Sequence, residues 1–436
     1  EIMPSLVGSE MCIRDRFSDV VEAEPETLTF RPELKPVLEH HLIPNCVCKI
    51  FKIATRVKGQ VMVRTCIEGR VNWHTNVDSV HPCRNSEVAV TLVVASDLRV
   101  GRSGSSEESE GGDAAVAVLV GSCDEGPLLA EYLGGAAASA EFTDRWRIPG
   151  EAHSRTWEDR FGEQAYRPLV EKAWDDALQA VGLEADDVDR AVVTGLHRRA
   201  TARSASALGV AGADDLATEV GNTGAAHSAL LLAHLLDSAE ADRVVALVVL
   251  ADGCDVLLFR TTGALGSGRP ARTVSAPLGH RADVPYGRYL AWRGLLDAQA
   301  PNRPAPSRTS SPAALRRADW KLGLVGSRDT TTGITHLPPS RIGILGGVVD
   351  DMEEAPMADA VGEIVTVTVD RLAYSPSPPV VFAVVDFEGG GRMPVELADV
   401  DPDAVAIGDP VEMTFRRLNS ADGIHNYFWK ARPVRA

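Results

Sequence analysis

The sequence predicts an α/β protein in which a layered domain of strands and helices precedes a small all-β barrel. Between residues 86 and 265, runs typical of buried strands alternate with an amphipathic helix. After residue 352, five short strands follow one another with Gly and Pro between them. Residues 266–318 separate the two parts and are rich in Pro, Ser and Arg, which predicts a linker with a short helix near 286–296.

Composition limits the classes of partner. The chain has 436 residues and a net charge of −17, which argues against nucleic acid or an anionic membrane as its main partner. Its longest apolar run, 244–251, is too short to cross a bilayer, and residues 1–30 lack the pattern of a secretory signal. Seven Cys without a framework spacing favour a reducing compartment, so we expect a cytoplasmic protein.

The first 85 residues differ in composition from the rest. Residues 6–16, LVGSEMCIRDR, resemble the translation of a sequencing-library transposase adapter, so we interpret 1–16 as an artefact. Residues 17–85 contain two Ala and four of the seven Cys, and we leave them unassigned as a chimeric piece or a divergent N-terminal half. Their Cys and His residues do not follow a usual zinc-ligand spacing.

The layered domain, 86–265, is read from its elements in order. Strand runs at 88–96 and 113–120 flank a Gly/Ser/Glu loop, and an amphipathic helix spans Tyr166 to Leu178. A β-branched strand, 191–194, ends just before His197, and Asn222 lies in a Gly-Asn-Thr-Gly turn that opens a second helix. Residues 243–259 predict a hairpin with its turn at Asp252-Gly253.

The stretch from Arg190 to Asp237 resembles the C-terminal half of the thiolase superfamily, particularly hydroxymethylglutaryl-CoA synthases and ketoacyl synthases of type III. SDLRVGRSGSSEE, GGDAAVAVLVG and FTDRWRIP support the same resemblance. It implies a layered αβαβα fold whose N-terminal half is incomplete here. It also implies an acyl-CoA partner, a CoA thioester as substrate or ligand with no other cofactor, and a homodimer or a complex with a partner thiolase.

By this resemblance His197 and Asn222 are catalytic candidates. An imidazole can assist proton transfer, and imidazole and carboxamide N–H groups can stabilise the oxyanion of a thioester. The structural alternative is that His197 is a satisfied residue at a strand end and Asn222 a helix cap. Family members also need a nucleophilic Cys. Cys66 lies 31 residues before Asp97, at roughly the right distance, but no amphipathic helix follows it.

Five further residues are candidates for CoA binding: Arg198, Arg199, Arg203, Gly221 and Gly253. Guanidinium groups can pair with the phosphates of CoA. The alternative is that the three arginines are solvated charges on a helix surface. By the resemblance, the turn at Gly253 approaches the active site.

The last hundred residues resemble acyl-CoA-associated OB-fold proteins through TVTVDRLAYSPSPPVVFAVVDFEGGGRMPVELADV. We assign 353–436 to this barrel and 319–352 to a degenerate form of the rubredoxin-like zinc ribbon that usually precedes it. Pro338-Pro339-Ser340-Arg341 is retained, but the four Cys positions are occupied by Asp329, Thr332, Gly343 and Gly346. We therefore predict no metal, because thiolates supply the charge and soft donors that hold Zn²⁺.

Two functions follow from these resemblances. The first is an acyl-CoA thioester-handling protein, a synthase- or thiolase-type acyltransferase fused to an acyl-CoA-binding OB domain. The second is a non-catalytic acyl-CoA-binding scaffold for a partner thiolase. Whether the chain is an enzyme stays open at this point, because its nucleophile is not identified.

Overall fold

The computed structural model describes residues 50–55, 90–121, 126–268, 273–281, 283–297, 299, 302–345, 347, 349–375 and 377–434, with residues 50–55, 90–92 and 280 by their backbone only. The contacts divide the chain into two compact units. We call the unit that ends at Val284 the central unit and the unit that begins at Pro285 the C-terminal unit. The division falls inside the predicted linker.

A mixed seven-stranded sheet organises the central unit. In order across the sheet, its strands are β2 (Val90–Leu98), β3 (Asp113–Gly121), β1 (Ile50–Thr55), β4 (Ala130–Ser139), β9 (Gly253–Thr261), β8 (Val244–Leu250) and β7 (Arg190–Gly195). The β8–β9 pair is the predicted hairpin, and β7 runs parallel to β8. Two strands of two residues each, β5 (Arg145–Trp146) and β6 (Arg155–Thr156), pair antiparallel outside this sheet.

Helices cover the sheet on two sides. They are α3 (Ser106–Ser109), α4 (Asp159–Val181), α5 (Arg198–Ala207), α6 (His227–Ser238) and α7 (Leu265–Gly268), with 3-10 helices η3 (Ala185–Asp187), η4 (Gly224–Ala226) and η5 (Ala276–His280). Alternate residues of β8 belong to different cores: Leu247 packs in the cluster of α6, and Val248 in the cluster of α4. All of β8 is buried for this reason, as expected of a strand with a helix on each face.

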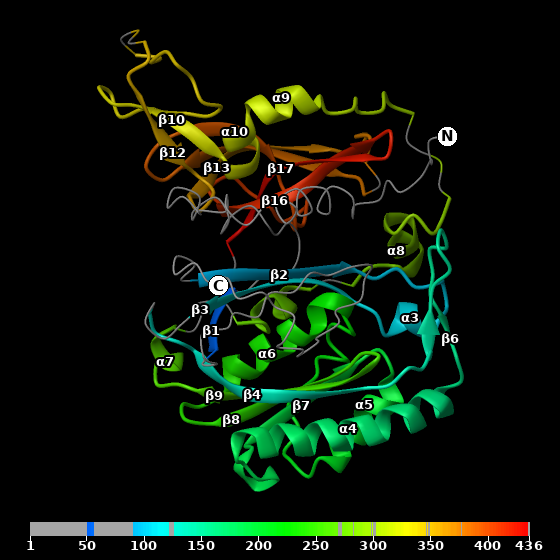
Figure 1. The fold of residues 1–436 in the computed structure, drawn as a ribbon. Helices are drawn as coiled ribbons and strands as arrows, with labels where there is room; N and C mark the ends of the chain where they lie inside the picture. The colour runs from blue at the N-terminus through cyan, green and yellow to red at the C-terminus, as the bar shows by residue number, and fades with distance from the viewer. Residues whose placement is uncertain are drawn as a thin grey trace. The chain divides into compact units, whose positions relative to one another are not determined.

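The layers follow from these two cores. The cluster around α6 also includes Val116 and Val118 of β3, so α6 lies between β2–β3 and the β7–β8–β9–β4 part of the sheet (Figure 1). The cluster around α4 covers the opposite face of that part. The described layers are therefore, in order, α4, the β7–β8–β9–β4 part of the sheet, α6, and the strands β2 and β3. The predicted layered α/β architecture is confirmed.

A five-stranded antiparallel barrel organises the C-terminal unit. Its strands, in order, are β15 (Arg392–Glu396), β14 (Val380–Phe387), β13 (Val361–Asp370), β16 (Pro410–Ala421) and β17 (Ile424–Pro433). A bridge between Leu397 and Ala431 joins the two ends of this order, so the barrel is nearly closed. In β14 the burial alternates, because every second side chain points into the core. The predicted OB-type barrel is confirmed.

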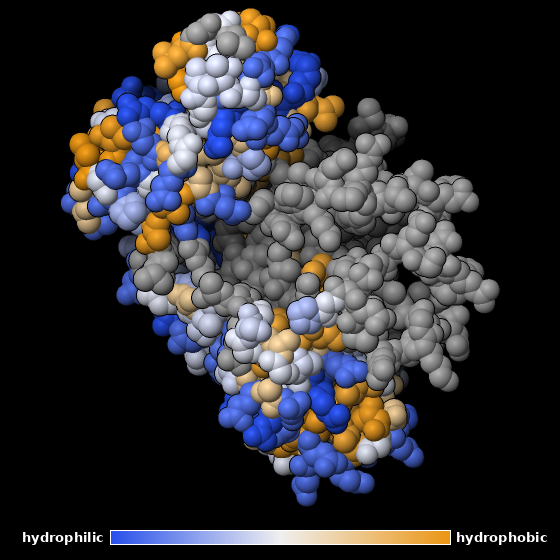
Figure 2. Space-filling model, turned by 90° about the vertical axis from the view of Figure 1, so that its left-hand side faces the viewer, coloured by the Kyte–Doolittle hydropathy of each residue, from blue (hydrophilic) through white to orange (hydrophobic). Residues whose placement is uncertain are grey.

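The remaining elements of this unit precede the barrel. They are α8 (Tyr286–Trp292), α9 (Ser311–Arg316), α10 (Ala318–Gly323) and a three-stranded sheet of β11 (Thr335–His336), β10 (Val325–Asp329) and β12 (Met352–Pro356). The short helix predicted in the linker is therefore present as α8. On the face shown in Figure 2, hydrophobic side chains lie in patches among hydrophilic ones. The exposed apolar residues of this unit include Ile344 and Leu345, in the segment that connects β11 to β12.

Two of the differences from the sequence prediction concern the second predicted helix and strand β4. The helix expected to open at Asn222 begins at His227, because the short helix η4 comes first. Strand β4, AEYLGGAAAS, was not predicted; its Gly and Ala residues have low strand propensity, and it is a strand through its pairing with β9 and β1. Among the described residues, no helix is both long and apolar enough to cross a membrane.

Candidate functional site

His197 stands at the junction of β7 and α5. It is the N-cap of α5, and its Nδ1 accepts a hydrogen bond from the backbone N–H of Ala200 at 3.1 Å. Its Nε2 lies 2.9 Å from the backbone oxygen of Asp159. A carbonyl can only accept, so Nε2 carries the proton and the imidazole is neutral in this arrangement. Both ring nitrogens are thus engaged with backbone groups, which is the geometry of the structural alternative.

Asn222 lies beside the same strand end. Its Nδ2 donates to the carbonyl oxygen of Gly195, the last residue of β7, at 3.0 Å. Its Oδ1 accepts from the N–H of Gly224 at 2.8 Å, as in an Asx turn. The carboxamide therefore ties its own turn to the strand end that carries His197 two residues later. The structure brings the two predicted residues to one end of β7.

A half-buried polar cluster that the sequence did not reveal lies next to His197. The Tyr166 side chain of α4 lies close enough to the Asp144 carboxylate and to the backbone N–H of Asp252 for both groups to affect its pKa. The ring centroids of Tyr166 and His197 lie 6.0 Å apart. Burial raises the pKa of Asp144, and a positive charge on His197 would oppose that rise. Burial, with Asp144 beside it, also raises the pKa of Tyr166 well above its ordinary value.

Gly162 on α4 fits this cluster closely. A Cβ at this position would lie 2.4 Å from Cδ2 of His197 and 3.5 Å from Cβ of Asp144. A side chain at Gly162 would clash with the imidazole, so the glycine allows α4 to pack close to His197. Asp144 is part of FTDRWRIP and Tyr166 part of the predicted helix. Both residues had a predicted place in the fold but no predicted role, because no sequence signal connects them to His197.

A second polar network holds the Asn222 turn from the β2–β3 side. The backbone N–H of Asn222 donates to the carbonyl oxygen of Glu110 at 2.7 Å, and its carbonyl accepts from the N–H of Gly112 at 3.0 Å. The Asp97 carboxylate accepts from the N–H of Ala225 at 3.0 Å. Arg99 also reaches the Asn222 carbonyl, and burial lowers its pKa although nearby carboxylates oppose this. The turn is therefore fixed from both sides.

The three arginines predicted to meet CoA lie on α5 and face carboxylates. Arg198 pairs with Glu110 at 3.0 Å, and Arg203 pairs with Glu163 at 2.9 Å. Arg199 is 4.0 Å from Asp159. All three are exposed, so these pairs contribute little to stability and leave the guanidinium groups accessible to another anion. Phosphate binding by these residues stays a prediction.

The two predicted CoA-binding glycines have packing reasons of their own. Gly221 has a φ of +79°, and a Cβ there would lie 2.7 Å from the carbonyl oxygen of Glu110. Gly253 has a φ of +152°, and its Cβ would lie 2.6 Å from the carbonyl oxygen of Ala138 in β4. Both positions require glycine because backbone approaches closely. A contact with CoA remains to be tested.

The nucleophile candidate Cys66 lies outside the described residues. Among those residues the free cysteine is Cys254, which is buried in β9. Burial, with Asp255 adding to the effect, raises the pKa of Cys254 to about 12. Its thiol is therefore protonated at neutral pH and does not supply a thiolate for acyl transfer.

The degenerate ribbon positions come together around Asp329. Its Oδ1 accepts from the backbone N–H groups of Thr331 and Thr332, at 2.9 and 3.0 Å. A Cβ on Gly343 would lie 2.1 Å from Oδ2 of Asp329, so the carboxylate takes the space that a side chain there would need. Gly346 lies outside the described residues. In the part of the chain that the structure describes, no group of three or more His, Cys, Asp or Glu side chains is arranged to hold a metal.

Comparisons with known proteins separate the two parts of the chain. Residues 354–416 match the family model described as ChsH2, C-terminal OB-fold domain. A DUF35 domain-containing scaffold protein of Methanothermobacter thermautotrophicus is 42% identical over 57 residues, which are 13% of this chain and 43% of that protein. A hydroxymethylglutaryl-CoA synthase of Caldivirga maquilingensis is 26% identical over 212 residues, or 47% of this chain and 60% of the synthase. A thiolase-like region precedes an OB-fold domain.

The similarity is partial in each case. The chain spans less than two thirds of the length of both of these relatives. A solved structure described as HMG-CoA synthase complexed with CoA has a TM-score of 0.41 and 13% identity, covering 60% of this chain and 77% of that one. The predicted combination of thiolase-like and OB-fold parts is confirmed. The assignment of the site residues depends on the geometry alone.

Proposed function

We propose that the thiolase-like region binds acyl-CoA thioesters for thiolase-type acyl transfer. The observation that carries this is the Asn222–Gly195 hydrogen bond, which brings an amide donor and the imidazole of His197 to one end of β7. The similarity to a protein named hydroxymethylglutaryl-CoA synthase supports CoA thioesters as the substrate class. The exposed arginines of α5 supply positive charge for the CoA phosphates.

The chemistry assigns a role to each group. A neutral imidazole with its proton on Nε2 can donate to a thioester oxygen as that oxygen becomes negative. To do so, His197 has to exchange its bond to the Asp159 carbonyl for one to the substrate. Asp144 and Tyr166 act as positioning residues beside the imidazole. The acyl group itself needs a thiolate, which Cys254 does not provide and for which Cys66 remains the candidate.

The second reading is a scaffold that binds acyl-CoA, or a partner thiolase, without catalysis. It is favoured by the OB-fold match and by the name of the DUF35 scaffold relative. In either reading the chain pairs with itself or with a partner thiolase. A thiol-release assay separates the two readings, because only the enzyme forms and resolves an acyl-enzyme.

Binding is measured by titrating the full chain with acetyl-CoA in a calorimeter. We expect saturable binding, and we expect Arg198→Gln to weaken it about tenfold, since a charge-assisted hydrogen bond contributes about 1.5–3 kcal/mol. Arg167→Gln is the matched control, because Arg167 is an exposed arginine of α4 paired with Glu171 and is not part of the site. No detectable acetyl-CoA binding, or equal losses in both variants, contradicts the proposal.

Turnover is measured as free CoA released from acetyl-CoA and acetoacetyl-CoA, with intact mass to detect an acetylated chain. Binding without release of free CoA favours the scaffold. Release that disappears in both His197→Ala and Cys66→Ser identifies the enzyme and its nucleophile. Release that persists in Cys66→Ser excludes Cys66.

A further inference from the structure

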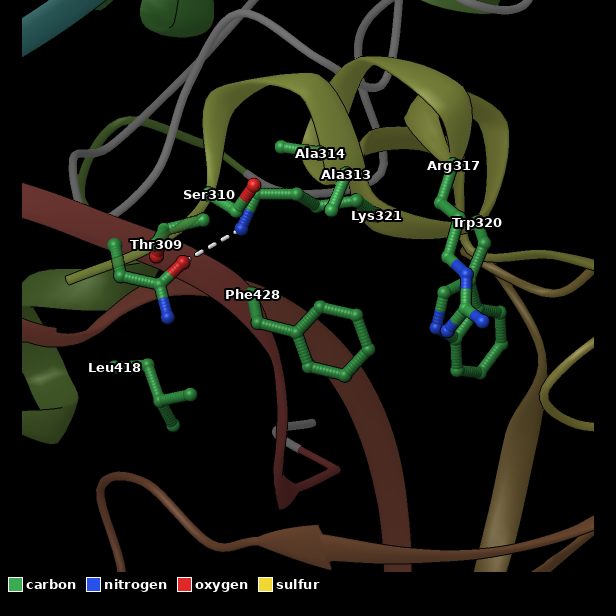
Figure 3. Close-up of a pocket in the computed structure, with 10 residues that line it drawn as sticks. Thr309, Ser310, Ala313, Ala314, Arg317, Trp320, Lys321, Leu418 and Phe428 are labelled. Atoms are coloured by element: carbon green, nitrogen blue, oxygen red, sulfur yellow. Dashed lines mark hydrogen bonds between the residues drawn. The ribbon is translucent and has the colours of Figure 1, made fainter. Parts of the chain in front are cut away.

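A small hollow in the C-terminal unit lies between the helices α9 and α10 and the strands β16 and β17 (Figure 3). Its volume is about 210 Å³. We call it the α10 pocket. The residues that line it are Thr309, Ser310, Ala313, Ala314, Arg317, Trp320, Lys321, Leu418, Asn426 and Phe428.

The wall of the α10 pocket is mainly apolar. The rings of Trp320 and Phe428 pack against each other with centroids 5.5 Å apart. The register between β16 and β17 shifts at Leu418, which lies between the paired residues Arg417 and Asn419. Such a bulge re-aims a side chain, and here it places Leu418 among the lining residues.

Two cationic side chains, Arg317 and Lys321, also line the α10 pocket, and none of the lining residues is acidic. Lys321 donates to Oδ1 of Asn426 at 2.6 Å and to the carbonyl oxygen of Tyr427 at 2.7 Å, which leaves one of its three N–H donors. Burial lowers the pKa of Lys321, so its ammonium is incompletely solvated. Arg317 is exposed and forms no ion pair among the residues that the structure describes.

These features define the chemistry of a ligand. An apolar pocket with a few convergent polar groups is the usual form of a small-molecule site, and an unpaired guanidinium is complementary to a carboxylate. A hollow of this volume has room for about seven water molecules at roughly 30 Å³ each, so it fits a molecule with a similar number of heavy atoms.

We propose that the α10 pocket binds a small amphipathic monocarboxylate, with its chain against Phe428, Trp320 and Leu418 and its carboxylate on Arg317. The Lys321 ammonium adds positive field to the same hollow. This site lies in the C-terminal unit, and it does not depend on thioester binding by the thiolase-like region.

The test compares three small molecules on the full chain by saturation-transfer NMR titration. Pentanoate has the chain and the charge, 1-pentanol has a similar chain without the charge, and acetate has the charge without the chain. We expect pentanoate to bind with a Kd on the order of 1 mM, as is reasonable for so few atoms, and the other two at least fivefold more weakly.

Variants then locate the contact. Arg317→Gln should weaken pentanoate about tenfold and leave pentanol unchanged, because only the charged head loses its partner. The control Arg316→Gln, in the last turn of α9 but outside the lining, should have no effect. Phe428→Leu, chosen to keep an apolar barrel residue, should weaken both ligands. Equal affinity for pentanoate and pentanol, no saturable binding, or insensitivity to Arg317→Gln overturns the proposal.

Discussion

At the scale of single residues, His227 is the histidine with the most strongly lowered pKa in the part of the chain that the structure describes. It opens α6 with 4% of its surface exposed, and its Nδ1 lies 3.3 Å from Oγ1 of Thr223. Burial lowers the pKa of His227 to about 4; Arg99 adds to this and Asp215 opposes it. The folded chain therefore keeps this imidazole neutral at pH values at which an unfolded chain protonates it.

The sign of the pH dependence follows from that difference. Above an unfolded pKa near 6.5 neither state binds the proton, so His227 makes no pH-dependent contribution there. As the pH falls from about 6.5 to 4, only the unfolded chain gains the proton, and the folded state loses up to about 3 kcal/mol. We expect His227→Gln to remove much of this loss. Urea unfolding at pH 7.5 and pH 5 measures it.

Thr223→Val is the matched control for His227→Gln. It removes the hydroxyl beside Nδ1 but keeps the imidazole and its burial. The drop in stability between pH 7.5 and pH 5 should therefore persist in Thr223→Val. If His227→Gln shows the same drop as the unmodified chain, another group is responsible and the burial argument for His227 is wrong.

At the scale of elements, the turn before α6 is shaped by a glycine. Gly224 has a φ of +56°, and a Cβ there would lie 2.0 Å from Oδ2 of Asp97, the carboxylate that holds Ala225. Gly224→Ala should therefore cost about 1–3 kcal/mol of unfolding free energy through left-handed strain and the displaced carboxylate. Denaturant unfolding measures the loss.

Gly263→Ala provides the comparison for Gly224→Ala. Gly263 is exposed, its φ lies outside the left-handed region, and nothing would lie within 4 Å of an added Cβ. This change should stay within about 0.5 kcal/mol of the unmodified chain. A loss in Gly224→Ala no larger than in Gly263→Ala contradicts the assigned role of Asp97 in the turn.

The sequence predicted the elements whose own pattern determines them. The uniform run of β8 and the helical spacing on α4 are local signals, and both elements appear where expected. Strand β4 has no such signal, because it becomes a strand through pairing with its neighbours β9 and β1. The position of His197 at the end of β7 was predictable, but its contact with the Asp159 carbonyl was not, since Asp159 is 38 residues away in sequence.

The candidate site shows the same limit. Spacing could place Asn222 on a turn, but the bond to Gly195 joins residues 27 apart. Asp144 and Tyr166 meet only because α4 packs beside the end of β7, and burial then raises their pKa values. The sequence shows directly that Cys is missing at the ribbon positions. It does not show that the Asp329 carboxylate packs against Gly343, because that contact depends on the fold.

At the scale of the whole molecule, the two units have separate hydrophobic cores. Leu258 is fully buried in a cluster of the central unit, and Ile364 is fully buried in the barrel cluster of the C-terminal unit. No residue belongs to clusters of both units among the described residues. Independent cores allow independent unfolding, so we expect two calorimetric transitions in the full chain.

Two core truncations assign these transitions. Leu258→Ala and Ile364→Ala each remove a fully buried aliphatic side chain, at a cost of about 2–5 kcal/mol to the unit that holds it. Leu258→Ala should lower only the transition of the central unit, and Ile364→Ala only that of the barrel. If both variants shift a single transition by similar amounts, the units unfold as one cooperative body. Binding of acetyl-CoA should raise only the transition that Leu258→Ala lowers, because a ligand stabilises the unit that holds it.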